Sequence, residues 1–165
     1  MKHKIASIMI FLSTLIVSQL FAAASPKKKA ELQARSLEKL EIEITEVKKE
    51  TKSGFAFLEV TAKVIKVTAS KTKLKEGDEI KIIYETPTKK GRNTGKVPPG
   101  DWASEIVKDG KYYAYLGKVH AANWNQEAEN EEWVKINRDK IRATKGTVYE
   151  PTAVSASFES LKKEK

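Results

Sequence analysis

A cluster of positive charge between two aromatic residues is the part of this sequence best suited to hold a ligand. Residues 86–101 contain four cationic side chains and a single acid, Asp101. Cations beside aromatic rings can bind an anionic polymer such as a phosphorylated glycan. The alternative is a solvated loop at the edge of the domain. The predicted ligand-binding residues are Tyr84, Lys89, Lys90, Arg92, Lys96 and Trp102.

A second candidate surface lies in the polar and acidic segment 120–133. Trp124 stands between two asparagines, a setting that favours exposure of its ring. Exposed aromatic residues are typical of protein contacts. We therefore predict a protein-contact surface formed by His120, Trp124 and Trp133. The alternative is that the tryptophans close a small core, as large aromatic residues usually do.

The sequence offers little support for metal or nucleophilic chemistry. His120 is the only histidine after residue 24, and no second ligand lies at metal-binding spacing from it. The glutamates in residues 127–132 lack the pattern of a calcium-binding loop. The chain has no cysteine and no Gly-x-Ser-x-Gly motif. We predict no metal, no cofactor and no catalytic residue. The alternative is a small hydrolase whose active site consists of two converging carboxylates.

The first 24 residues have the organisation of a secretory signal peptide. Lys2, His3 and Lys4 form a positive start, residues 5–20 are mainly apolar, and small residues end the segment at Ala24. The apolar run is short for a membrane span, so we expect cleavage after Ala24 and no stable membrane insertion afterwards. The alternative is an uncleaved anchor. Export without any cysteine is typical of the bacterial periplasm, so we predict a secreted or periplasmic bacterial protein.

The net charge of +9 belongs mainly to the two ends of the chain. Eight of the 31 basic residues and one of the 22 acidic residues lie in residues 1–29 and 162–165, which leaves 23 and 21 in between. We interpret both basic ends of the exported chain as disordered tails. A nearly neutral body without a basic stripe argues against nucleic acid as a partner.

Period-two alternation predicts an all-β domain after a short polar segment. We assign residues 25–39 to a polar, partly helical segment, 40–160 to the β domain and 161–165 to a basic tail. Leu40, Ile42 and Ile44 alternate with polar residues, which indicates a half-buried strand. In the long strand 55–68 the alternation slips after Val64, which indicates a bulge. The predicted inward-facing residues are Val60, Ala62, Val64, Ile80, Ile82 and Leu116.

Further strands are expected at residues 79–84, 111–116 and 147–158, the last interrupted at Pro151. Residues 85–102 are predicted to form a long loop, 103–107 one helical turn and 133–136 a short strand. Turns are expected at residues 51–54, 75–78 and 109–110. This arrangement favours a small five-stranded Greek-key barrel of the OB type, with a short N-terminal helix and long loops.

Three segments resemble the OB-type domain of the netrin-like and metalloproteinase-inhibitor group: residues 58–67, 74–82 and 107–116. Residues 149–151 and 157–159 make the chain similar also to small exported bacterial proteins of this fold. The resemblance implies an OB barrel and says little of function. The inhibitors of this group chelate zinc through an N-terminal cysteine. This chain would begin at Ser25 and has no cysteine, so that mechanism does not carry over.

Together these observations predict a non-enzymatic, exported binding module that holds an anionic envelope polymer. One alternative is an inhibitor or accessory subunit of another exported protein, and the other is the small hydrolase. The sequence does not decide between a polymer and a protein as partner.

Overall fold

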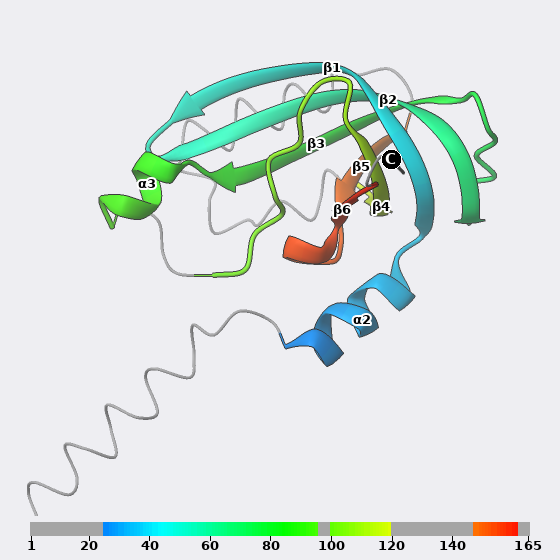
Figure 1. The fold of residues 1–165 in the computed structure, drawn as a ribbon, viewed down its shortest axis with the longest axis horizontal. Helices are drawn as coiled ribbons and strands as arrows, with labels where there is room; N and C mark the ends of the chain where they lie inside the picture. Colours follow the sequence, from blue (N-terminus) through cyan, green and yellow to red (C-terminus); the bar gives the residue numbers. More distant parts are fainter. Residues whose placement is uncertain (1–24, 96–99, 120–146, 162–165) are drawn as a thin grey trace, which may run out of the picture.

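The computed structural model describes residues 25–95, 100–119 and 147–161, and six strands form its body (Figure 1). The elements, in chain order, are α2 Pro26–Arg35, β1 Glu38–Lys52, β2 Phe55–Ser70, β3 Glu79–Pro87, α3 Lys89–Asn93, β4 Lys111–Lys118, β5 Val148–Pro151, the 3-10 turn η2 Val154–Ala156, and β6 Phe158–Ser160.

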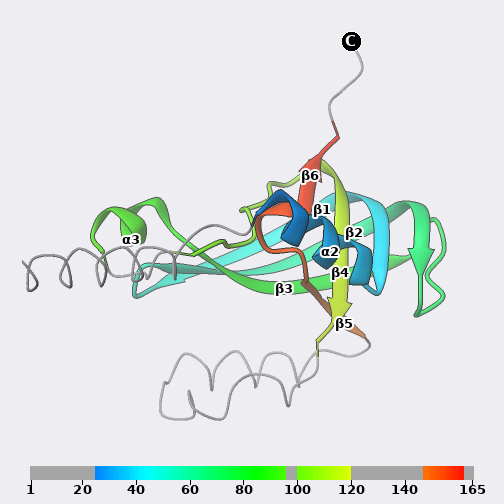
Figure 2. The same ribbon diagram turned by 90° about the horizontal axis from the view of Figure 1, so that it is seen from below.

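Five strands close into a barrel in the order β1-β2-β3-β5-β4, and β4 returns to β1. Among the described strand pairs, only β3–β5 is parallel. Figure 2 shows β4 crossing the long strands β1 to β3. The short strand β6 pairs with the first half of β4, and β5 pairs with its second half. The predicted all-β, OB-type barrel is therefore confirmed, with β6 as an additional short strand.

Alternation along the strands builds the core, as predicted. Leu40, Ile42 and Ile44 of β1 are at most 2% exposed, while the residues between them face outward. The six residues expected to point inward are all buried. The predicted bulge is also present, because Ile42 pairs with Val64 and the next pair is Glu41 with Lys66, which leaves Ile65 unpaired in the β1–β2 ladder. Bulges of this kind bend long strands into a small barrel.

Tight turns join the strands where the sequence predicts them. Ser53 and Gly54 connect β1 to β2, both with positive φ (52° and 90°). This backbone conformation matches the right-handed twist of a two-residue hairpin. The predicted break at Pro151 is also observed, because β5 ends there and η2 separates it from β6.

Two expectations for the region after β3 are wrong. Residues 85–102 do not form one continuous loop, because β3 continues to Pro87 and Thr88 then caps the short helix α3. Residues 103–107 form no helical turn. The Tyr84 and Thr86 hydroxyls of β3 donate instead to the carbonyl groups of Ser104 and Ala103, which fixes this segment against β3.

The predicted disordered tail at the start of the exported chain is instead helical, because Lys27, Lys28 and Lys29 belong to α2. Ser25 caps α2 by accepting a hydrogen bond from the Lys28 amide. Lys29 forms an ion pair with Asp101 (3.3 Å), and the Gln33 side chain donates to the Ala156 carbonyl (2.9 Å). These contacts hold α2 against the outside of the barrel near η2 (Figures 1 and 2).

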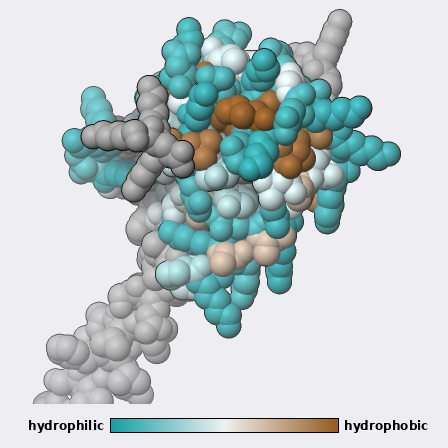
Figure 3. Space-filling model, turned by 45° about the vertical axis from the view of Figure 1, so that its right-hand side comes forward, coloured by the Kyte–Doolittle hydropathy of each residue, from teal (hydrophilic) through white to brown (hydrophobic). Residues whose placement is uncertain are grey.

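The signal peptide in residues 1–24, the strand at 133–136 and the end of the basic tail lie outside the described residues. Within the described part, no helix is long and apolar enough to cross a membrane. One face of the molecule shows a small hydrophobic area among mainly hydrophilic side chains (Figure 3). Val107 and Tyr113 are the exposed large hydrophobic residues of the described chain.

Candidate functional site

The helix α3 is fixed to the end of the β1–β2 hairpin by a contact between two glycines. A Cβ atom on Gly91 would lie within 2.7 Å of the Gly54 Cα, so only glycine permits this approach. Thr88 strengthens the junction, because its amide and its hydroxyl each donate to the Gly54 carbonyl (both 2.9 Å). The Thr88 hydroxyl also accepts from the Gly91 amide (2.9 Å) and caps the helix.

This junction presents three predicted ligand-binding residues at one corner of the barrel. Lys89, Lys90 and Arg92 are all exposed on α3, and we refer to these three residues as the basic corner. Figure 1 shows α3 projecting where β1 ends, β2 begins and β3 ends. Among the residues that the structure describes, none of the three side chains forms an ion pair. The backbone of α3 is therefore firmly held, and it presents three exposed cationic side chains to an anion.

Trp102 lies at the same end of the sheet. Its ring meets that of Phe55 edge to face, with centroids 5.6 Å apart. Phe55 follows Gly54 directly and pairs with Pro87, the last residue before the Thr88 cap. Trp102 is half-buried, and its indole Nε1 has no hydrogen-bond partner among the described residues. The fold thus brings an aromatic pair close to the hairpin that carries the basic corner.

Tyr84 is placed differently from the sequence prediction, which made it part of a surface site. Its side chain is only 5% exposed and packs against Phe158 in the core (centroids 5.5 Å apart). Its hydroxyl donates to the Ser104 carbonyl (2.9 Å) and accepts from the Ile106 amide (3.3 Å). Burial raises the pKa of Tyr84 well above its usual range. The sequence signal for this burial is the alternation along β3, because Tyr84 follows Ile80 and Ile82 at the next inward-facing position.

The other predicted site residues lie outside the described residues. Lys96 belongs to the ligand-binding set, and His120, Trp124 and Trp133 make up the whole protein-contact set. The structure therefore brings together four of the six predicted ligand-binding residues at one end of the sheet, counting Trp102, and places the fifth in the core.

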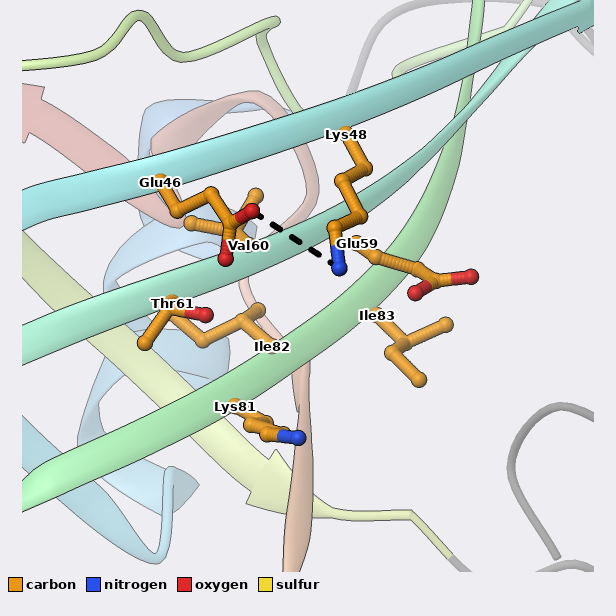
Figure 4. A pocket seen from close by; sticks show the side chains of 8 residues that line it. All are labelled: Glu46, Lys48, Glu59, Val60, Thr61, Lys81, Ile82 and Ile83. Atoms are coloured by element: carbon orange, nitrogen blue, oxygen red, sulfur yellow. Dashed lines mark ion pairs between the residues drawn. The ribbon is translucent and has the colours of Figure 1, made fainter. Parts of the chain in front are cut away.

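The outer face of β1, β2 and β3 carries a small pocket of about 60 Å³ (Figure 4). Its polar lining is balanced in charge, with Glu46 and Glu59 against Lys48 and Lys81. Glu46 and Lys48 form an ion pair at 3.7 Å, drawn as a dashed line in Figure 4. So small and internally compensated a hollow is suited to a water molecule rather than to a larger ligand.

A larger groove lies between the second half of β3 and the segment after β5. It has a volume of about 320 Å³. Its walls come from β3 and from the end of β5 with η2, and Trp102 and Ala103 also line it. We call it the β3 groove, and its lining residues are Ile83, Tyr84, Glu85, Asp101, Trp102, Ala103, Glu150, Pro151 and Val154. Sequence reasoning missed this groove, because its walls are far apart in the chain.

No group of three or more histidine and acidic side chains within the described residues is arranged to hold a metal ion. A scan against protein-family models and searches of curated proteins and of solved structures found no match to this chain. Membership of the netrin-like group therefore stays a prediction that rests on sequence pattern alone.

Proposed function

We propose that this protein is an exported, non-enzymatic binding module that holds an anionic polymer at its basic corner. The observation that carries the proposal is the rigid attachment of α3, through Gly91 and Gly54, with three exposed cations that form no ion pair among the described residues. A ligand that binds there meets a helix whose backbone is already fixed in place, which lowers the entropy cost of binding.

The chemistry of the basic corner favours a polymer over a small anion. Its side chains are exposed, and the described structure has no enclosed pocket around them. Exposed charges attract anions weakly and are screened over about 8 Å at physiological ionic strength. Useful affinity then requires repeated contacts along a chain of anionic groups. The Phe55–Trp102 pair offers an apolar surface at the same end of the sheet.

The test is binding of residues 25–165 to immobilised heparin and to polyphosphate at low and high salt. The variant changes Lys89, Lys90 and Arg92 to Gln. The matched control changes Lys71, Lys73 and Lys75 to Gln, which removes the same charge from the exposed turn between β2 and β3. We expect salt-sensitive binding that the basic-corner variant weakens by about tenfold, or about 1.4 kcal/mol, and that the control changes by less than about twofold.

The unchanged protein and the two variants should have the same thermal unfolding midpoint, because exposed lysines and arginines add little to stability. Equal losses in the two variants would show that the polymer responds only to net charge. Absence of binding by the unchanged protein to either polymer would reject the proposed function.

A further inference from the structure

The first turn of α2 carries two exposed cations, Lys27 and Lys28, which we call the α2 pair. Neither side chain forms an ion pair among the described residues. α2 has no buried residue, and polar contacts dock it on the barrel. The Gln33 side chain supplies two of them, by donating to the Ala156 carbonyl (2.9 Å) and to the Glu159 carboxylate (2.7 Å). The α2 pair therefore stands on a docked helix rather than on a loose end.

A series of contacts links the docked helix to the basic corner. Lys29 follows the α2 pair directly, and its Nζ lies 3.3 Å from Oδ2 of Asp101. The next residue is Trp102, whose ring meets that of Phe55 beside the hairpin turn that holds α3. Figures 1 and 2 both show the segment that begins at Gly100 lying between α3 and α2. A path therefore runs from the basic corner, over the two aromatic rings, to the first turn of α2.

The acid on this path presents little negative charge to a ligand. The Asp101 side chain is only 12% exposed, and Lys29 lies against it. An opposite charge at this distance compensates a carboxylate. Phe55 and Trp102 are half-buried and offer apolar contact between the two sets of cations. The path thus presents cations at both ends and aromatic rings between them.

We propose that the α2 pair is a second contact for the anionic polymer, so that one linear chain reaches from the basic corner to the first turn of α2. This inference rests on the proposed function and specifies its ligand, a polymer with anionic groups long enough to meet both sets of cations. Once the basic corner has bound one part of the chain, the α2 pair meets the rest at high effective concentration. A short anion fills one set only and binds weakly, because exposed charges are screened by salt.

The probes are a heparin tetrasaccharide and a heparin dodecasaccharide, each labelled with fluorescein and followed by fluorescence anisotropy with residues 25–165 at low salt. The measured quantity is the ratio of their dissociation constants, which we call the length advantage. The α2 variant changes Lys27 and Lys28 to Gln. The matched control changes Lys71 and Lys73 to Gln, which removes the same charge from the exposed turn between β2 and β3.

A further variant tests position without changing charge. Gln33→Pro breaks α2 inside its last turn and removes the two hydrogen bonds of the Gln33 side chain. The barrel should stay folded, because α2 has no buried residue, and thermal unfolding checks this. The α2 pair then no longer stands on a docked backbone, so a chain that binds it must also order the helix. This variant should lose most of the length advantage.

We expect the length advantage to fall by about fivefold in the α2 variant and by less than about twofold in the control. An unchanged length advantage in the α2 variant, equal losses in the α2 variant and the control, or a full length advantage in the folded Gln33→Pro protein would each overturn this inference. The proposed function would survive those results, because the basic-corner variant tests it separately. Absence of binding of both oligosaccharides by the unchanged protein would instead reject the proposed function, and this inference with it.

Discussion

Gly91 of α3 lies directly against Gly54 of the β1–β2 turn, at a separation that leaves no room for a side chain on Gly91. The Gly54 carbonyl accepts hydrogen bonds from both the amide and the hydroxyl of Thr88. This pair of glycines joins two segments that are far apart in sequence. It is the reason that three cations from a short helix have a defined position on the barrel.

The first prediction concerns this contact. Gly91→Ala should lower the free energy of unfolding by about 1–3 kcal/mol, because a methyl group forced into a filled contact shifts the backbone around it. Amide signals of Gly54 and Thr88 in a nitrogen-15 NMR spectrum should move as α3 is displaced. Asn93→Ala, at an exposed position of the same helix, should cost less than about 0.5 kcal/mol. Unchanged signals in the Gly91 variant would contradict the contact.

The second prediction concerns the register of β3. Ile82 is fully buried, so Ile82→Ala should cost about 2–5 kcal/mol in a urea denaturation experiment. Lys81 is exposed on the opposite face, and Lys81→Ala should cost less than about 0.5 kcal/mol. Similar costs for the two changes would mean that the two faces of the strand are assigned the wrong way round.

The barrel could be predicted from the sequence because each strand carries its own local signal. Leu40, Ile42 and Ile44 alternate with polar residues in one short stretch, and the slip after Val64 marks the bulge. The same phase rule also applies to Glu38, the first residue of β1, and to Tyr84 within β3, because each belongs to the buried row of its strand. Tyr84 is predicted at a surface site from its chemical character, but its position in the buried row determines its burial.

Contacts between distant segments could not be predicted in this way. Nothing local to Gly91 indicates Gly54 as its neighbour, and nothing local to Trp102 indicates Phe55. The β3 groove likewise depends on the chain after β5 lying opposite Glu85. Such sites arise only when the barrel closes, so the sequence predicted the cations of the site and not the junction that holds them.

The third prediction concerns Glu38, a fully buried carboxylate on β1. One oxygen, Oε1, accepts from the Thr72 amide (3.0 Å), and Oε2 has no hydrogen-bond partner among the described residues. Glu38→Gln keeps the acceptor for Thr72 and removes a buried charge, so we expect stability to be unchanged or higher. Glu38→Ala loses the acceptor and leaves a cavity, and it should cost about 2–4 kcal/mol.

Chemical denaturation of both Glu38 variants at neutral pH provides the measurement. If Glu38→Gln lowers the free energy of unfolding as much as Glu38→Ala does, the negative charge itself stabilises the fold through a partner beyond the described residues.

The last prediction is a pH dependence that originates in Tyr84. Burial raises the pKa of its phenol far above the usual value of about 10, and the hydrogen bond from Ile106 offsets this only in part. In the unfolded chain Tyr84 ionises near its usual pKa. Above about pH 10 the unfolded state therefore holds fewer protons than the folded state, and the free energy of unfolding falls by up to about 1.4 kcal/mol per pH unit.

Tyr84→Phe removes this effect together with the hydroxyl group. At neutral pH the variant should be less stable by about 1–3 kcal/mol, because the Ser104 carbonyl and the Ile106 amide lose their partner. As the pH rises from about 9 to about 11, the unchanged protein loses stability from Tyr84 and the variant does not, so the difference between them should shrink. Urea denaturation of both proteins across this range measures that difference. A constant difference would mean that Tyr84 ionises as readily in the folded protein as in the unfolded chain, which its buried position between β3 and residues 104–106 does not allow.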